Sequence, residues 1–432
     1  MSQPDNRKRV AIISGLRTPF ARSGTIYRDL TPLDLGKIAV TELVNRTEID
    51  PADVGALVFG SVMPSVRTPN IARDVALGSG IPDRVPAFTV SSSCASSVQA
   101  ITNAVDSILS GAADAVIAGG AECISDGSYL FSTARRHAGL ESAKGKNLID
   151  KVSPLFRMGA SGHGPVLAVM PERYAGLTTG EAAEKTASEY KISRAEQDGF
   201  ALRSHSFASR AEGEGIFEDE IIHTFIPPHF KEAIIKDNSI DENASMDTLG
   251  DLPPLFDREF GTVTAGNSAP IADGAAAVLL MSEEKARALG YKPLAYIKSY
   301  AYSASNPDSE LLMSSVYAIA KALDRAKITL GDVDLVEMHE AFSAQVISSI
   351  KALSSKGFAK EKLGRPQAVG EIDMERFNVS GGSIALGHAL GATGARLVTT
   401  LVYRMARRKG QFGLVALPAA GGLGVSIVLE KE

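Results

Sequence analysis

The sequence contains no tryptophan and only two cysteines, Cys94 and Cys123, among 432 residues. So few cysteines exclude a disulfide framework and any metal site built from several cysteines, and they favour a reducing compartment. Basic residues are slightly fewer than acidic ones, 45 against 50, which gives a formal net charge of −5, and the sequence has no long basic stripe. This charge balance argues against a nucleic-acid-binding protein.

We also expect neither a membrane-spanning segment nor a secretion signal. The longest uncharged run, Gln411–Leu429, is long enough to cross a membrane, but Pro418 and a glycine-rich middle divide it into two buried strands, 413–417 and 424–429. The N-terminus leads from a polar start directly into a strand-like VAIIS, without an apolar signal core or the features of a transit peptide. We therefore expect no transmembrane segment, and the bacterial cytoplasm rather than the mitochondrial matrix.

Short apolar strands alternate with stretches of helical spacing near both ends of the chain. Glycines separate them, as in the loop predicted from Gly15 to Phe20. Such alternation predicts an α/β protein whose sheets are covered by helices. The predicted strands lie at 10–14, 54–62, 87–90 and 113–120, and the predicted helices at 33–44, near 71–77 and from about 98 to 109.

This alternation stops between residues 126 and 256 and returns at 261–281. The interrupting segment carries many charges and five of the seven histidines, with clear helical spacing only at 182–190 and 195–211. A long excursion of this kind is typical of a segment that covers an active site. We therefore predict a first half made of 1–125 and 257–291, an inserted loop domain at 126–256, and a second half at 292–432.

Three sequence patterns occur twice in the same order. FTVSSSC at Phe88 matches FNVSGGS at Phe377, DVGALVFG at Asp53 matches DVDLVEMH at Asp332, and the AVIAGG that starts at Ala115 resembles a stretch near the C-terminus. The individual matches are weak, but their common order is hard to obtain by chance. We infer two similar halves, related by a pseudo-twofold axis.

Cys94 lies where a predicted strand gives way to a predicted helix, among small residues that leave room for a substrate. The dipole and the unpaired N–H groups at a helix N-terminus stabilise a thiolate. A catalytic nucleophile is one interpretation of this position. A small buried core residue, which is the commonest role of a cysteine without a disulfide, is the other.

Two histidines of the second half follow predicted strands or glycine-rich turns. His339 stands in VEMHEAF and His388 in GGSIALGHALGATGA. If the strand ends of both halves face one pocket, either histidine could meet Cys94, where it would act as a base, and glycine N–H groups could hold an oxyanion. Each histidine could equally be a structural residue with satisfied hydrogen bonds.

Together these motifs resemble the thiolase family, and within it the long-chain 3-ketoacyl-CoA thiolases that form the β-subunits of trifunctional β-oxidation complexes. The resemblance covers nearly the whole chain, and HEAF at His339 is typical of the long-chain branch. The motifs that carry it are RTPF at Arg17, SCASSVQA at Ser93, AGGAE at Ala118, TVTAGNS at Thr262, DGAAAV at Asp273, HEAF at His339, NVSGGSIALGH at Asn378, GATGAR at Gly391 and AAGGLG at Ala419.

The resemblance implies a specific fold and site. The fold would be two βαβαβαββ halves in a five-layer α-β-α-β-α core, with an inserted loop domain that binds CoA. Cys94 would be acylated, His388 would activate it, and His339 would help to form an oxyanion hole with a bound water. The matched motifs place candidate CoA contacts at Ser268, Gly382, Gly421 and Gly422, and the loop domain adds Arg135, Arg136 and Arg157.

The same resemblance bears on cofactors and partners. CoA and acyl-CoA would be substrates, and neither a metal ion nor a permanently bound cofactor would be needed. A homodimer or homotetramer would be expected, and a hydratase/dehydrogenase α-subunit could be a further partner.

Three positions depart from the family pattern. Pro418 stands where thiolases carry a second catalytic cysteine, Ala389 replaces the usual proline of GHP, and TTG at Thr178 replaces a common MG. Proline has no titratable group and no N–H, so it cannot carry the proton that the second cysteine normally transfers.

Three functions therefore remain open. One is an acyl-CoA C-acyltransferase of thiolase type. Another is a condensing enzyme that uses the Cys-His-His set of Cys94, His388 and His339, like the ketoacyl synthases that share the fold, with poor thiolysis. The third is a weakly active subunit retained for complex assembly.

Overall fold

The computed structural model describes residues 8–63, 65–127, 129–130, 133–144, 146–147, 149–150, 153, 166–167 and 176–432. The chain forms two compact units, 126–171 and the remainder. The described part of the smaller unit contains helix α4 (Thr133–Lys144) and a pair of short strands, β6 (Tyr129–Leu130) and β7 (Val166–Leu167). The larger unit carries both predicted halves.

The first half is built on five strands in the order β4-β3-β5-β10-β1. The strand β3 runs parallel to β4 and β5, whereas β10 is antiparallel to both β5 and β1. Every residue of β3, β5 and β10 is buried, as expected for strands covered on both faces. The five strands are β1 (Val10–Arg17), β3 (Ala56–Gly60), β4 (Ala87–Val90), β5 (Ala115–Glu122) and β10 (Ala272–Ser282).

The second half repeats this order as β12-β13-β14-β11. Where β4 lies in the first half, Phe377 makes a parallel bridge to Val336 of β12. The directions also match, because β12 is parallel to β13 and the remaining pairs are antiparallel. The predicted pseudo-symmetric halves are thus confirmed. The strands are β11 (Ala295–Ala304), β12 (Leu335–Met338), β13 (Phe412–Ala419) and β14 (Leu423–Glu430).

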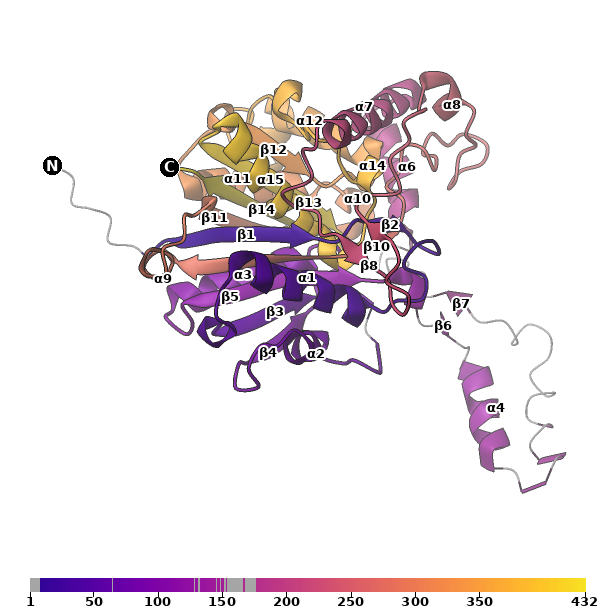
Figure 1. The fold of residues 1–432 in the computed structure, drawn as a ribbon. Coiled ribbons are helices and arrows are strands. Elements are labelled where there is room, and N and C mark those ends of the chain that lie inside the picture. The colour runs from indigo at the N-terminus through magenta and orange to yellow at the C-terminus, as the bar shows by residue number, and fades with distance from the viewer. Residues whose placement is uncertain are drawn as a thin grey trace. The chain divides into compact units, whose positions relative to one another are not determined.

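Helices form three layers around these strands, with the first half below the second in Figure 1. The central layer is α3 and α15, whose apolar side chains pack against strands of both halves in one cluster. The outer layers are α1 and α2 on the first half and α11 and α12 on the second. The helices are α1 (Pro32–Thr47), α2 (Ile71–Gly78), α3 (Ser96–Leu109), α11 (Ser314–Ala326), α12 (Ser343–Ser354) and α15 (Thr393–Arg408).

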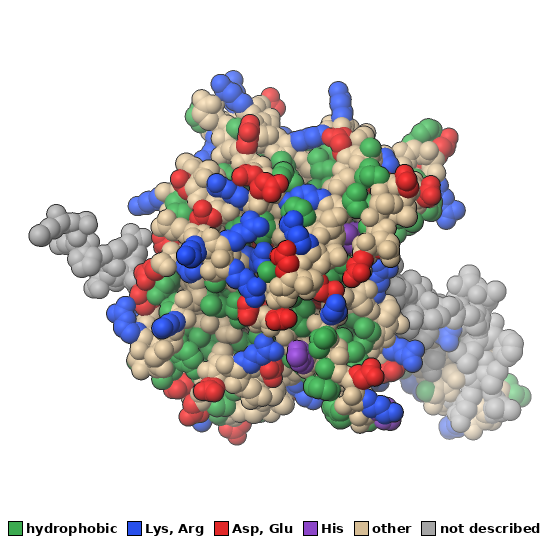
Figure 2. Space-filling model, turned by 45° about the horizontal axis from the view of Figure 1, so that its top comes forward, with side chains coloured by type: hydrophobic (Ala, Val, Ile, Leu, Met, Phe, Trp, Pro, Cys, Tyr) green, Lys and Arg blue, Asp and Glu red, His purple; other side chains and the backbone are tan. Residues whose placement is uncertain are grey.

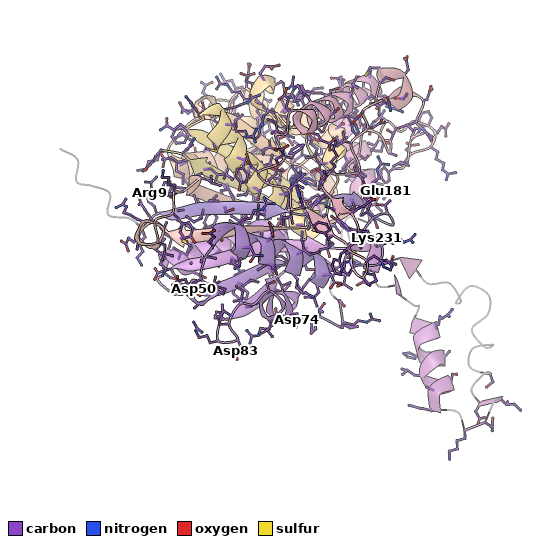
Figure 3. The ribbon with its side chains drawn as sticks, in the orientation of Figure 1. Arg9, Asp50, Asp74, Asp83, Glu181 and Lys231 are labelled. Atoms are coloured by element: carbon purple, nitrogen blue, oxygen red, sulfur yellow. The ribbon has the colours of Figure 1, made fainter. Side chains whose placement is uncertain are left out.

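Two helices of the predicted insertion belong to the larger unit and pack on the second half. Helix α6 (Thr179–Glu189) contacts α12, and α7 (Arg194–Gly213) contacts the short helix α14 (Ser383–Leu386). The TTG departure has a structural explanation here. Thr178 caps α6 by accepting from the N–H of Glu181, whose carboxylate accepts from the N–H of Thr178 at 2.6 Å. Glu181 is labelled in Figure 3.

Shorter elements complete the larger unit and connect these layers. They are β2 (Ala21–Arg22), β8 (Thr224–Phe225), β9 (Ala233–Ile234), α8 (Met246–Gly250), α9 (Glu283–Ala288), α10 (Pro307–Glu310) and α13 (Lys356–Lys362).

The predicted loop from Gly15 to Phe20 is wrong at its start, because β1 continues to Arg17. The strand extends since Gly15 and Leu16 keep pairing with β10. Arg17 is fully buried, and its guanidinium binds Glu220 Oε1 at 2.6 Å and both oxygens of Asp237, at 2.7 and 2.9 Å. Such a buried charge requires these partners, so RTPF fixes segment 217–240 to the sheet.

Both signs of charge occur across the face of the molecule in Figure 2. The acidic residues Asp50 and Asp83, labelled in Figure 3, are exposed at the surface of the first half. None of the helices in the described part of the chain is long and apolar enough to cross a membrane.

Candidate active site

Cys94 lies in a tight turn between the end of β4 at Val90 and the start of α3 at Ser96. Ser93 adopts a left-handed conformation with φ of 49°. Ser96 holds the turn, because its hydroxyl donates to the carbonyl of Ser93 at 2.6 Å and accepts from the N–H of Ser92 at 2.9 Å. Cys94 is half-buried, and it lies two residues before the start of α3, where the helix N-terminus favours a thiolate.

His388 is brought to Cys94 from the second half. Its Nε2 lies 3.3 Å from Cys94 Sγ, although 294 residues separate the two. Nδ1 of His388 lies 2.7 Å from the hydroxyl of Thr393, the first residue of α15. The backbone of His388 pairs with Pro270 and Ala272, so both its ring and its main chain are fixed.

Burial, followed by the positive charge of Arg396, lowers the pKa of His388 to about 3. The imidazole is therefore neutral at physiological pH, with one nitrogen able to accept a proton. Since Nε2 faces the thiol, this geometry suits a general base for Cys94.

His339 follows β12 and packs directly on His388. Their ring centroids are 4.2 Å apart with a tilt of 42°. His339 is fully buried, its N–H donates to the carbonyl of Ala416 at 2.9 Å, and its Nδ1 lies 2.8 Å from the hydroxyl of Ser383. Burial, followed by the charges of His388 and Arg396, lowers its pKa well below the usual value. Its Nε2 has no partner among the described residues.

The turn that carries His339 is braced by two polar residues that sequence reasoning did not single out as site residues. Asn378 accepts from the N–H of Met338 at 2.8 Å and donates to the carbonyl of Met338 at 2.9 Å and to Glu340 at 2.7 Å. Glu340 also accepts from the hydroxyl of Ser204 on α7 at 2.7 Å. The signal was present, because Asn378 and Glu340 stand inside NVSGGS and HEAF.

A further buried carboxylate, Glu122, holds the loops on the first-half side of the site. It accepts from the N–H groups of Val62, Met63 and Gly391 at 2.8, 3.0 and 3.1 Å. Burial raises its pKa to about 7, although these hydrogen bonds act in the opposite direction. Gly391 is three residues from His388, so Glu122 links the ends of β3 and β5 to the loop that carries His388.

The predicted CoA contacts lie in three places. Ser268 is beside the His339 turn, where it bridges to Phe342 and donates to the carbonyl of Thr264 at 2.6 Å. A side chain on Gly382 would collide with the carboxylate of Glu340, so this glycine permits close packing. Gly421 and Gly422 form the turn between β13 and β14, both with positive φ. Their contact with CoA stays a prediction.

Contact of the three predicted arginines with CoA also stays a prediction. Arg135 belongs to α4 of the smaller unit, whereas the side chain of Arg136 and all of Arg157 lie outside the described residues. Cys123 is buried, with its thiol 3.2 Å from the carbonyl of Leu30 and 3.7 Å from that of Tyr27.

Pro418 is buried near the end of β13, opposite Gly424 of β14. The same strand supplies Ala416, whose carbonyl accepts from the N–H of His339. Pro418 is therefore two residues from a direct backbone contact to the site. That it faces Cys94 stays a prediction.

This fold and this site define a class of protein with two similar α/β halves, in which Cys94 of one half meets His388 of the other and His339 packs on His388. Two family models match the two halves of the chain. The thiolase N-terminal domain matches residues 10–284, and the thiolase C-terminal domain matches residues 291–431. The chain belongs to the thiolase family, which confirms the resemblance inferred from its motifs.

Individual relatives match along the entire fold. The chain is 45% identical over 424 residues to a 3-ketoacyl-CoA thiolase of Yersinia enterocolitica and 46% identical to one of Photorhabdus laumondii, covering 98% of this chain and 97% of each relative. Among solved structures, Bacillus anthracis acetyl-CoA acetyltransferase aligns with a TM-score of 0.85 at 31% identity, over 99% of this chain and 100% of that one. Human mitochondrial 3-ketoacyl-CoA thiolase in complex with CoA aligns at 0.84 and 30%, over 98% of each chain.

Proposed function

We propose that the protein is an acyl-CoA C-acyltransferase of thiolase type that transfers acyl groups through a thioester on Cys94 in fatty-acid metabolism. The observation that carries this proposal is the 3.3 Å approach of His388 Nε2 to Cys94 Sγ. A neutral imidazole at this distance can take the thiol proton, and the sequence relatives are named 3-ketoacyl-CoA thiolase.

In the first half-reaction, His388 accepts the proton of Cys94 as the sulfur attacks the 3-keto carbon of a 3-ketoacyl-CoA. A C–S bond forms and the bond between C2 and C3 breaks, so the electron pair passes to C2 as the enolate of acetyl-CoA. The proton held by His388 can then neutralise C2. The products are acetyl-CoA and acylated Cys94.

In the second half-reaction, the thiol of CoA transfers its proton to His388 and its sulfur attacks the thioester. The new acyl-CoA leaves, and Cys94 recovers the proton. An N–H at His339 Nε2 would stabilise the oxyanion of either tetrahedral intermediate, directly or through a water. His388 handles every proton in this scheme because Pro418 cannot.

Pro418 favours a second candidate function, a condensing enzyme that uses Cys94, His388 and His339. Decarboxylation generates a carbanion without a base, so such an enzyme does not need the missing cysteine. A single general acid–base group typically raises a reaction rate by roughly 10² to 10⁴-fold. Slow thiolysis would thus accompany normal acylation of Cys94.

CoA and acyl-CoA are the proposed substrates, and a CoA complex exists for a related human enzyme. We further propose the long-chain branch and a homodimer or homotetramer. The proposed contacts to CoA come from Ser268, Gly382, Gly421 and Gly422 and from the segment 126–256. We also propose a hydratase/dehydrogenase α-subunit as a partner and a bacterial cytoplasmic location; the relatives named above are bacterial.

The test is to incubate the purified protein with a long-chain 3-ketoacyl-CoA and CoA, and to quantify acetyl-CoA by chromatography. The proposal expects acetyl-CoA and the shortened acyl-CoA in equal amounts. Condensation with malonyl-CoA and release of CO2, without thiolysis, would select the condensing enzyme instead. Neither reaction, with no acylation of Cys94, would leave a subunit retained for assembly.

A further inference from the structure

A buried chain of hydrogen bonds leads from a cation to His339. Arg396 on α15 donates from Nη2 to the hydroxyl of Ser383 at 2.6 Å, and the same hydroxyl lies 2.8 Å from His339 Nδ1. All three side chains are fully buried. Water therefore cannot easily compete for these groups, so their hydrogen atoms must be distributed among the protein atoms themselves.

The direction of this chain follows from the donors available. An arginine only donates, so the oxygen of Ser383 accepts from Arg396. The hydroxyl has a single hydrogen, and His339 Nδ1 is the other partner recorded for it. The hydroxyl must therefore donate to Nδ1, because the reverse arrangement would leave its hydrogen buried without an acceptor.

We propose that Ser383 and Arg396 are positioning residues that fix His339 as the tautomer with its proton on Nε2. Nδ1 is occupied as an acceptor, so the ring proton must sit on the nitrogen that has no partner in the described residues. A buried N–H without an acceptor is costly in a resting protein, but it is what an oxyanion hole requires.

The positive charge of Arg396 also favours a neutral His339. Arg396 is fully buried and its Nη1 is 3.9 Å from Glu337, a carboxyl whose pKa is raised to about 8 mainly by burial. The guanidinium is thus weakly neutralised, and it lowers the pKa of both histidines. A neutral His339 with a polarised hydroxyl on Nδ1 is a stable donor at Nε2.

The internal repeat gives this assignment a structural context. Aligning Phe88 with Phe377 places Ser383 at the position of Cys94. Cys94 follows β4, and Ser383 follows the bridge that Phe377 makes to β12. Cys94 contacts His388, and Ser383 contacts His339. His388 must accept at Nε2 to take the thiol proton, whereas His339 must donate there. The two pseudo-equivalent positions thus impose opposite tautomers on two stacked rings.

The inference rests on the proposed function, since it assigns Nε2–H to an oxyanion, but its test does not need activity. The protein has seven histidines. In ¹⁵N-histidine-labelled full-length protein, two-bond ¹H–¹⁵N correlation spectra distinguish the tautomers, and the signals of His339 are identified by their loss in His339→Asn. The expected result is a single Nε2–H tautomer. A proton on Nδ1 would overturn the proposal.

The variants Ser383→Ala and Ser383→Thr complete the test. Ser383→Ala should shift the His339 Nδ1 resonance and mix the tautomers. It should slow acylation of Cys94 at least tenfold while changing alkylation of Cys94 by iodoacetamide less than threefold, because His388 is untouched. Ser383→Thr keeps the hydroxyl and should restore the tautomer. Unchanged His339 resonances in Ser383→Ala would refute the relay even if the unaltered enzyme proved inactive on every acyl-CoA.

Discussion

The imidazole rings of His339 and His388 pack with centroids 4.2 Å apart and have pKa values lowered by burial. Two imidazole rings so close together in a buried site cannot both be positively charged without a large cost in free energy. The resting site therefore holds two neutral histidines. One can then act as a base toward Cys94 while the other donates an N–H.

Replacing His388 should weaken the nucleophile. In His388→Ala, alkylation of Cys94 at pH 7 should slow at least tenfold and its pH profile should move to higher pH, because the thiol loses the base at 3.3 Å. Rates of iodoacetamide modification across pH 5 to 10, read by mass spectrometry, provide the measurement. His229→Ala, at an exposed histidine, is the matched control. A profile identical to that of the unaltered protein would remove His388 from the mechanism.

Restoring the family residue at Pro418 should raise thiolysis. Pro418→Cys supplies a proton carrier, and we expect at least a tenfold gain, below the roughly 10² to 10⁴-fold typical of such groups. The rate of the second half-reaction is measured with preformed acyl-enzyme and CoA. Pro418→Ala relaxes the backbone without adding a titratable group and is the control. Fast thiolysis in the unaltered chain, with no gain in Pro418→Cys, would show that the histidines suffice.

Glu122 should make the stability of the protein depend on pH. Its folded pKa, about 7, exceeds the ordinary value of 4.5, so the folded state retains a proton that the unfolded state has lost between these pH values. Glu122 therefore adds about 3 kcal/mol to the free energy of unfolding below pH 4.5. This contribution is lost as the pH rises through 7. Because the raised pKa of Glu337 adds a loss of its own in both proteins, the free energy of unfolding in urea should fall between pH 5 and pH 8 in each, and it should fall less in Glu122→Gln than in the unaltered protein.

Glu284→Gln, at an exposed carboxylate of α9, provides the control for that comparison. It should follow the unaltered protein at both pH values. An equal decline between pH 5 and pH 8 in Glu122→Gln would mean that another buried carboxyl, such as Glu337, causes it.

The sequence was informative where local patterns dictate structure. The repeat predicted two halves of the same strand order, because equivalent strands carry equivalent motifs at Asp53 and Asp332 and at Phe88 and Phe377. Cys94 could be placed at a strand–helix junction from the change of period alone. The pairing of Cys94 with His388 depended on assuming that strand ends of both halves face one pocket.

The supporting polar network could not be predicted in this way. Glu122, Ser383 and Arg396 stand inside the motifs AGGAE, NVSGGSIALGH and GATGAR, but a motif does not say which groups its residues bind, and their roles arise only from tertiary contacts. Glu122, for example, binds an N–H that lies 269 residues away. The length of β1 was missed for the same reason, since Arg17 stays in the sheet because Glu220 and Asp237 neutralise it.

The central claim is that Cys94 carries the acyl group, and mass analysis of the acylated protein tests it most directly. The protein is incubated with an acyl-CoA, quenched in acid and digested, and the modified peptide is sequenced by mass spectrometry. The account predicts one acyl group per chain on Cys94, none on the buried Cys123, loss of the adduct in Cys94→Ala, and its retention in Cys123→Ala. An adduct on any other residue, or acyl exchange between CoA molecules by Cys94→Ala, would contradict it.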